Sequence, residues 1–245
     1  MKPAFAGKTD KGLIRAVNQD AYHIDDAGRF FIVADGMGGH AAGQDASRIA
    51  KEAICHHLDL GYNSEDDPET LLRKAFIGAN KAIMEDQLVH PENADMGTTA
   101  VAILLQPGPN GESLQVWCAN LGDSRIYRFR DETLEQVTED DTWVAQAIKA
   151  GVLPAEEARE HPWRHVLSQC LGREDMGELE ILSLDVAPGD QFLLCSDGLS
   201  EELTDDRIAA ELAASKDCHD ATTRLIETAK AEGGRDNITV VLLRF

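Results

Sequence analysis

Two segments of this sequence share one pattern, a strongly apolar run that ends in aspartate followed by glycine. The first runs from Phe30 to Gly36 and the second from Phe192 to Gly198. A single Asp-Gly after a strand usually marks only a turn. A third segment is therefore informative, because Asp236 comes directly before the apolar run 238–245. Together the three segments predict strands whose ends carry carboxylates.

The side chains of Asp35, Asp197 and Asp236 are expected to meet in space. If the last strand runs antiparallel to the other two, all three carboxylates lie at one end of the sheet. Carboxylates that converge at buried strand ends cannot stay ionised without a compensating cation. Mg²⁺ or Mn²⁺ bound by oxygen ligands meets that need. Gly36 lets the backbone approach such an ion closely, so its carbonyl oxygen is a further candidate ligand.

Two turn segments add polar groups to this picture. Arg15 and Asp20 come just before the strand-like run 21–24, and Asp123 lies at the tip of a predicted hairpin. The guanidinium of Arg15 suits two-point binding of a phosphoryl group. From residue type alone, a surface ion pair explains this arginine equally well.

The segment 36–41 also fits the GxGxxA pattern of dinucleotide-binding proteins. That motif needs a second strand that ends in an acidic residue about 20 residues further on. Here the chain enters a long helix instead, and Asp35 would place a negative charge beside the pyrophosphate. We therefore reject a nucleotide site and expect no organic cofactor.

Apolar periodicity predicts the remaining elements. The long helices are expected at 41–60 and 68–90. Strands are expected at 29–34, 98–105, 114–119, 125–129, 134–137, 179–184, 191–195 and 238–245, and shorter helices at 143–150, 155–160, 205–214 and 219–231. Two runs of strands, each bordered by helix pairs, predict an α+β fold with a central antiparallel β-sandwich flanked by helix pairs on both faces. Without a linker-like segment, residues 1–245 are expected to form a single domain, with an excursion at 142–172.

The composition limits the partners of the chain. Acidic residues number 44 against 23 basic ones, a net charge of −21, which disfavours nucleic acid and anionic membranes as partners. We see neither a membrane-spanning stretch nor a secretion signal. The five cysteines are scattered and never spaced as CxxC, which argues against disulfides and a zinc-thiolate site. A cytoplasmic location is expected.

These motifs resemble the type 2C (PPM) family of metal-dependent Ser/Thr protein phosphatases, in its compact bacterial form. The matching segments occur in family order and span nearly the whole chain. They are RAVNQD (15–20), VADGMGGHAAG (33–43), MGTTA (96–100), NLGDSR (120–125), CSDGLS (195–200) and GRDNITV (234–240).

The resemblance implies a two-metal centre at one end of the sandwich. Asp35 would bridge both ions, and the carbonyl of Gly36 would bind the second ion. Asp197 and Asp236 would complete the coordination of the first ion.

The resemblance also assigns the outer residues of the site. Asp20 would hold metal-bound waters, and Asp123 would join Asp197 at a third, weaker ion. Arg15 would bind the phosphate. Residues 142–172 resemble the flap that borders the site and influences the choice of substrate.

Two positions depart from the family pattern. Gln19 stands where many relatives have glutamate, so a direct carboxylate ligand of the second metal is missing. Met37 stands where eukaryotic relatives have a histidine proposed as general acid. His40 is a candidate proton donor, although an imidazole that packs against the following helix is an equally good interpretation.

The function that the resemblance implies is hydrolysis of phosphoserine and phosphothreonine on proteins. A metal-bridged water at a two- or three-metal Mn²⁺ or Mg²⁺ centre would attack phosphorus. The chain would act as a monomer on phosphoproteins and oppose a bacterial Ser/Thr kinase. Two alternatives stay open, a catalytically impaired domain of the same fold and a two-metal hydrolase of other substrates, such as a nuclease.

Overall fold

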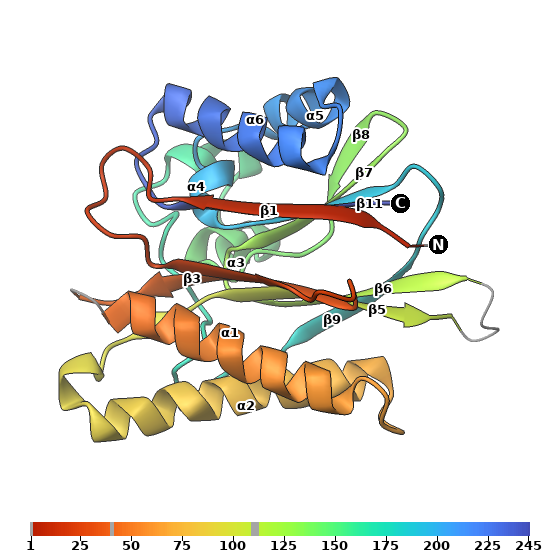
Figure 1. Ribbon diagram of the computed structural model, residues 1–245. Coiled ribbons are helices and arrows are strands. Elements are labelled where there is room, and N and C mark those ends of the chain that lie inside the picture. Colours follow the sequence, from red (N-terminus) through yellow and green to blue (C-terminus); the bar gives the residue numbers. More distant parts are fainter. Residues whose placement is uncertain (1, 40–41, 109–112) are drawn as a thin grey trace.

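The computed structural model describes residues 2–39, 42–108 and 113–245, and two antiparallel β-sheets packed face to face form its centre (Figure 1). The first sheet has the strand order β1 (Ala4–Asp10), β11 (Ile238–Arg244), β10 (Gln191–Cys195), β7 (Arg125–Arg130) and β8 (Thr133–Gln136). The second sheet has the order β2 (Asp20–Ile24), β3 (Phe30–Met37), β5 (Ala100–Pro107), β6 (Leu114–Leu121) and β9 (Glu180–Asp185), with β4 (Gly97–Thr98) paired to β3.

Two pairs of helices cover the outer faces of the sandwich (Figure 1). The pair α1 (Ala42–Gly61) and α2 (Pro68–Val89) lies on the second sheet, and α5 (Asp205–Ala214) and α6 (Cys218–Glu232) lie on the first. The N-terminus of α2 shows why a helix begins there, since Asp67 accepts a hydrogen bond from the backbone amide of Thr70 at 2.9 Å.

Three apolar layers hold the four layers of secondary structure together. In β3 the side chains of Phe30 and Ile32 pack under α1 and α2, whereas Phe31 and Val33 pack against the other sheet. Successive side chains of a strand point to opposite faces, so a strand buried on both faces must be apolar throughout. This explains the unbroken apolar run before Asp35.

Most elements predicted from the sequence are confirmed, and the α-β-β-α architecture with them. The strand at 191–195 and the helix at 205–214 match to the residue. The sequence analysis missed β1 and the four-residue helix α4 (Asp197–Ser200). The predicted helix at 155–160 is a 3₁₀ helix, η2 (Ala155–Glu160); a shorter one, η1 (Pro91–Asn93), was not expected.

The predicted arrangement of the three aspartate-bearing strands in one sheet is wrong. The strands β10 and β11 are antiparallel neighbours, but β3 belongs to the other sheet. Asp35 therefore approaches Asp197 and Asp236 across the interface between the sheets. The polarity of strand ends predicts that side chains share one end of a fold, but it does not tell which sheet each strand joins.

Residues 142–172, which we call the flap, leave the sandwich between β8 and β9. The flap contains α3 (Trp143–Lys149) and η2. Isolated β-bridges from Thr142 to Leu167 and from Thr98 to Leu171 join its two ends to each other and to the body. In the part of the chain that the structure describes, no helix has the length and apolar character needed to cross a lipid bilayer.

Candidate metal centre

A cavity of about 560 Å³ opens at the end of the sandwich where β3 and β10 end and β11 begins. Six of the residues predicted for the site line it, namely Arg15, Asp35, Gly36, Asp123, Asp197 and Asp236. Asp20 lies beside them, because it pairs with Asp35 in the register of β2 and β3. His40, the candidate proton donor, lies outside the described residues.

The glycines that follow Asp35 and Asp197 permit close backbone contacts. A Cβ atom at Gly36 would collide with the carbonyl oxygen of Gly43 in α1, and a Cβ atom at Gly198 with the carbonyl oxygen of Asn237. Glycine is the residue that allows such an approach. The second contact brings the start of α4 against the start of β11, and thus places Asp197 near Asp236.

A serine hydroxyl joins the two sheets beneath the carboxylates. Ser196 donates a hydrogen bond from Oγ to Oδ2 of Asp20 at 2.8 Å, and its Oγ accepts one from the amide of Thr239 at 3.0 Å. Ser196 and Thr239 belong to the first sheet region, and Asp20 to the second. This contact therefore sets the position of Asp20 relative to Asp197.

The threonines of the MGTTA segment hold the backbone of Asp35. Thr98 donates from Oγ1 to the carbonyl oxygen of Asp35 at 2.8 Å, and the amide of Asp35 donates to Oγ1 of Thr99 at 3.1 Å. The hydroxyl groups of Thr99 and Ser124 lie 2.7 Å apart. Thr99 thus connects Asp35 with the loop that carries Asp123.

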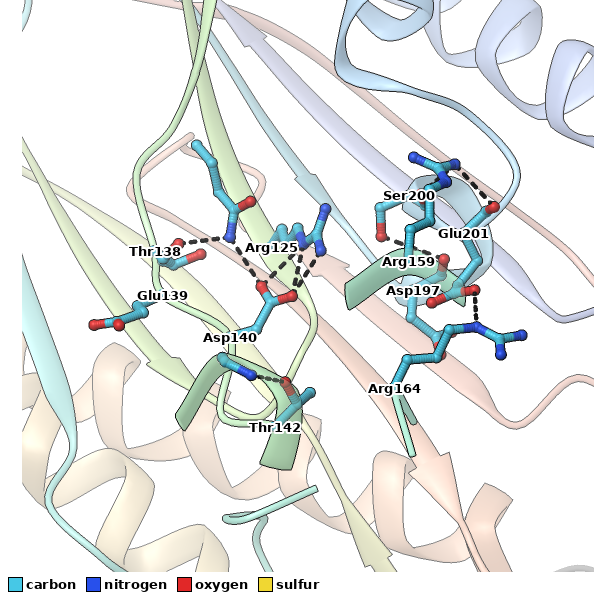
Figure 2. Close-up of polar contacts among 12 residues, drawn as sticks. Arg125, Thr138, Glu139, Asp140, Thr142, Arg159, Arg164, Asp197, Ser200 and Glu201 are labelled. Atoms are coloured by element: carbon cyan, nitrogen blue, oxygen red, sulfur yellow. Dashed lines mark hydrogen bonds and ion pairs between the residues drawn. The ribbon is translucent and has the colours of Figure 1, made fainter. Parts of the chain in front are cut away.

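The predicted hairpin around Asp123 is wrong, because the strands on either side of this turn, β6 and β7, belong to different sheets. An ion pair supports the start of β7, just after Asp123. Arg125 donates to Asp140 from Nε at 2.9 Å and from Nη2 at 2.6 Å (Figure 2). Its Nη1 donates to the hydroxyl of Tyr127 at 2.8 Å. Two parallel hydrogen bonds to one carboxylate fix the geometry of both partners. The pair connects the start of β7 to the segment that leads into the flap.

Asn237 positions the loop that carries Arg15. Its Oδ1 accepts from the amide of Gln19 at 2.8 Å, and its Nδ2 donates to the carbonyl oxygens of Lys11 and Val17, both at 3.0 Å. A side chain that satisfies three backbone groups of one loop holds it firmly. The sequence analysis did not assign Asn237 this role.

Arg15 forms an ion pair with one of the predicted metal ligands. Its Nη2 lies 2.5 Å from Oδ2 of Asp236, and Oδ1 of Asp236 accepts from the amide of Asn237 at 2.8 Å. The arginine side chain is 52% exposed and faces the cavity. The ion pair is thus confirmed, and phosphate binding by Arg15 stays a prediction that its place at the rim of the cavity permits.

Burial and mutual repulsion raise the pKa values of the clustered carboxyl groups. Burial followed by the charge of Asp197 holds the pKa of Asp123 well above its ordinary value. Burial together with the charges of Asp20, Asp197 and Asp123 does the same to the pKa of Asp35. Each of these groups thus favours a bound proton, or another positive charge, over free ionisation.

The donor set of the cavity fits a hard divalent cation. Oδ1 of Asp20 and Oδ1 of Asp197 are buried and have no hydrogen-bond partner among the described residues. Oxygen atoms of carboxylates are the ligands that Mg²⁺ and Mn²⁺ prefer. Within residues 2–39, 42–108 and 113–245, no three acidic, histidine or cysteine side chains form a ready-made metal site. Asp236 would have to exchange Arg15 for a cation.

The structure places in the cavity one residue that the sequence analysis did not predict for the site. His165, in the flap, has its Nδ1 4.0 Å from Oδ2 of Asp197. Its HPWRH segment has no partner at ligand spacing along the sequence, so only tertiary structure brings it here. Four consecutive flap residues, 167–170, also line the cavity. The flap therefore borders the carboxylate cluster.

Comparison with known proteins identifies close relatives. A family model described as protein phosphatase 2C matches residues 15–242. The chain is 38% identical over 242 residues to the serine/threonine protein phosphatase PstP of Mycobacterium tuberculosis, covering 97% of this chain and 44% of that protein. It is 34% identical to the serine/threonine phosphatase stp of Listeria welshimeri, covering 96% of this chain and 93% of the relative. The chain thus spans less than half the length of PstP.

Solved structures resemble this fold throughout. A crystal structure of PstP from M. tuberculosis superimposes with a TM-score of 0.88 at 35% identity, covering 100% of this chain and 99% of that one. A structure of the catalytic domain of PstP in complex with two manganese ions gives a TM-score of 0.87 at 34% identity, with 99% and 97% of the two chains covered.

Replacing Gly198 by alanine is expected to lower both stability and cation affinity. The added Cβ must push α4 away from Asn237, which costs about 1–3 kcal/mol of unfolding free energy and separates Asp197 from Asp236. Chemical denaturation and Mn²⁺ titration calorimetry measure the two effects. Gly39→Ala is the matched control, since nothing lies within 4 Å of its Cβ position. Equal behaviour of the two variants would contradict the assigned role of Gly198.

Cation binding is expected to release protons and to strengthen as the pH rises. Burial and the charge of Asp197 raise the pKa of Asp20 to about 7, and burial and the charge of Asp236 raise that of Asp197 to about 6. The cation-free folded state then binds more protons than the unfolded state, so these groups lower its stability as pH rises from about 4 towards about 7. A cation displaces the retained protons.

Titration calorimetry at about pH 6, in two buffers of different ionisation enthalpy, counts the released protons. We expect fewer protons to be released at about pH 8, where the carboxyl groups of Asp20 and Asp197 are already ionised. Equal proton release at both pH values would show that ionisation of Asp20 and Asp197 is not linked to cation binding.

Proposed function

This chain belongs to the protein phosphatase 2C family, and we propose that it removes phosphate from phosphoserine and phosphothreonine of proteins with two or three bound Mn²⁺ or Mg²⁺ ions. The single observation that carries the proposal is the cluster of carboxylates with raised pKa values in one cavity, with Arg15 at its rim. Both PstP and stp are named as serine/threonine phosphatases.

In this proposal each carboxylate of the cavity has a separate part. Asp35 would be a ligand of both cations, Asp197 and Asp236 would complete the coordination of the first, and the carbonyl oxygen of Gly36 would bind the second. When bound, the cations act as Lewis acids that activate water and polarise the phosphoryl group. The geometric support is that both Asp-Gly turns are fixed by backbone contacts, so the ligands need little rearrangement.

The outer carboxylates serve the weaker positions of the proposed centre. Asp20 lies behind Asp35 in the paired strand and is oriented by Ser196, a position that suits it to hold ordered water rather than to bind an ion directly. Asp123 lies in the turn between β6 and β7, which joins the two sheets, and with Asp197 it would bind a third ion. Gln19 also lines the cavity. Because it is a glutamine, the second cation would have one carboxylate ligand fewer than in many relatives.

Arg15 is the proposed phosphate-binding group. A guanidinium presents parallel N–H donors that match two phosphoryl oxygens. Asp236 is the present ion-pair partner of Arg15, so if Asp236 bound a cation, the guanidinium of Arg15 would be available to the phosphoryl group. The same positive charge offsets the negative charge that builds up on the phosphoryl oxygens during transfer.

The net charge of the chain and the names of its relatives support a phosphoprotein as the substrate. A chain with a net charge of −21 repels a nucleic acid backbone, which disfavours a nuclease with a similar two-metal centre. The retained carboxylates disfavour an impaired domain used only for binding. We propose phosphoproteins as substrates, among them proteins modified by a Ser/Thr kinase of the same cell.

Asp197→Asn is expected to abolish metal-dependent turnover and leave a folded protein. Loss of one charged ligand should lower hydrolysis of p-nitrophenyl phosphate in Mn²⁺ by about 10²-fold or more. Circular dichroism verifies folding. Asp131→Asn is the matched control, because Asp131 is exposed at a turn with φ 50°, which asparagine tolerates. Undiminished activity of the Asp197 variant would refute the proposed centre, and cleavage of DNA or RNA by the wild type would favour the nuclease.

Arg15→Ala is expected mainly to raise KM for a phosphopeptide, by about tenfold, since it removes charge-assisted hydrogen bonds to the phosphate. The fall in kcat should be smaller. Steady-state kinetics at saturating Mn²⁺ separate the two constants. Arg15→Lys keeps the charge and should recover part of the loss. An unchanged KM in the alanine variant would mean that phosphate is bound elsewhere.

A further inference from the structure

The flap is attached to the short helix α4 by two arginine side chains (Figure 2). Arg159 donates from Nη2 to the carbonyl oxygens of Ser200 at 3.3 Å and Glu201 at 3.1 Å. Arg164 donates from Nε to Oε2 of Glu201 at 3.1 Å. Both arginines therefore meet at Glu201, through its main chain and its side chain.

Glu201 is separated from a proposed metal ligand by a single helical turn. It directly follows α4, whose first residue is Asp197, and its amide donates to the carbonyl oxygen of Asp197 at 2.8 Å. His165 lies between the two carboxylates, with its Nδ1 3.8 Å from Oε1 of Glu201 and 4.0 Å from Oδ2 of Asp197. A displacement of Glu201 therefore moves the turn that carries Asp197.

The environment of the Arg164–Glu201 pair makes this attachment stronger than an ordinary surface contact. The two side chains are 31% and 32% exposed, so water screens their attraction only in part. The cationic Arg159 also binds carbonyl oxygens at the C-terminal end of α4, where backbone acceptors lack helical partners.

The base of the flap is held separately by backbone contacts. The amide of Ser168 donates to the carbonyl oxygen of Asp141 at 2.8 Å, and that of Trp143 to Val166 at 2.8 Å. These bonds close the flap on itself and join it to Asp141, in the segment that follows β8. The contacts at Glu201 thus connect the middle of the flap, residues 159–165, to the carboxylate cluster.

We propose that Glu201 is a positioning residue that couples the flap to the metal centre. By binding Arg159 and Arg164 it holds the flap over the cavity and the α4 turn in the orientation that Asp197 needs. Coupling of this kind is reciprocal, so a cation on Asp197 orders the flap, and an attached flap strengthens cation binding. The inference rests on the proposed function only in that Asp197 binds a cation.

Two of the three tryptophans of the chain lie in the flap and can report its state. The rings of Trp143 and Trp163 are 4.8 Å apart, and His161 stacks on Trp143 at 5.1 Å. Trp163 is 53% exposed, so its emission responds to the order of the flap. The third, Trp117, belongs to β6, and a Trp117→Phe background removes its signal.

The experiment titrates Mg²⁺, which does not itself quench fluorescence, into the Trp117→Phe protein, followed by tryptophan emission and by calorimetry. We expect Glu201→Gln to weaken Mg²⁺ binding by about three- to tenfold and to reduce the Mg²⁺-dependent change in emission. Arg164→Gln should have the same effect. Arg164→Lys keeps the positive charge and should weaken Mg²⁺ binding less. Glu157→Gln, which removes an exposed carboxylate of the flap, should change neither quantity.

The double variant Glu201→Gln/Arg164→Gln tests whether the two side chains act as one unit. We expect it to bind Mg²⁺ no more weakly than either single variant, since one broken pair cannot be broken twice. Fully additive losses would overturn the proposal. So would a Glu201→Gln protein with a lower Tm but unchanged Mg²⁺ affinity and emission, because a merely structural ion pair behaves in that way.

The outcome for the proposed function is read from the wild type. If the wild type binds Mg²⁺ and shows the emission change but hydrolyses no phosphoester, the proposed function fails and the coupling stands. If it hydrolyses phosphoesters while the Glu201 variant matches it in affinity and emission, the coupling fails alone. Absence of Mg²⁺ binding by the wild type would contradict both.

Discussion

The repulsion between carboxylates gathered at one end of the sandwich is the interaction on which the rest of the site depends. Burial raises the pKa values of Asp35 and Asp123, and the charge of Asp197 raises both further. Such an arrangement is stable only if the rest of the fold prevents the side chains from moving apart. The hydroxyl groups of Ser196, Thr98 and Thr99, together with the amide of Asn237, supply this restraint. Positive charge, from Arg15 or from a divalent cation, then becomes the energetically favoured partner.

Much of this arrangement could be predicted from the sequence because strong local patterns encode it. The apolar run before Asp35 is unbroken because β3 is covered on both faces. The apolar residues that recur with helical spacing in 68–90 form the buried face of α2. The Asp-Gly pairs indicate turns at which a side chain and a backbone can approach the same point. Those signals are carried by neighbouring residues, which is why a single sequence reveals them.

Other features could not be predicted, because they depend on which distant segments meet. The strand β1 has a weak apolar pattern and exists through its pairing with β11, more than 200 residues away. The assignment of β3 to one sheet and β10 to the other has no local signature. No motif marks His165 or Glu201 in the sequence, and only tertiary contacts bring His165 beside Asp197 and Glu201. The mutual attachment of flap and helix is likewise a property of the folded chain alone.

The division of the ligands between two sheets gives the apolar layer between them an unexpected importance. Asp35 moves with β3, whereas Asp197 and Asp236 move with β10 and β11, so the spacing of the centre is the spacing of the two halves of the sandwich. Side chains such as Phe31 and Phe192, remote from any cation, act as a spacer whose thickness sets the gap between the ligands. Substitutions in the apolar core between the sheets can therefore alter the metal preference of such a protein, as can changes of the ligands themselves.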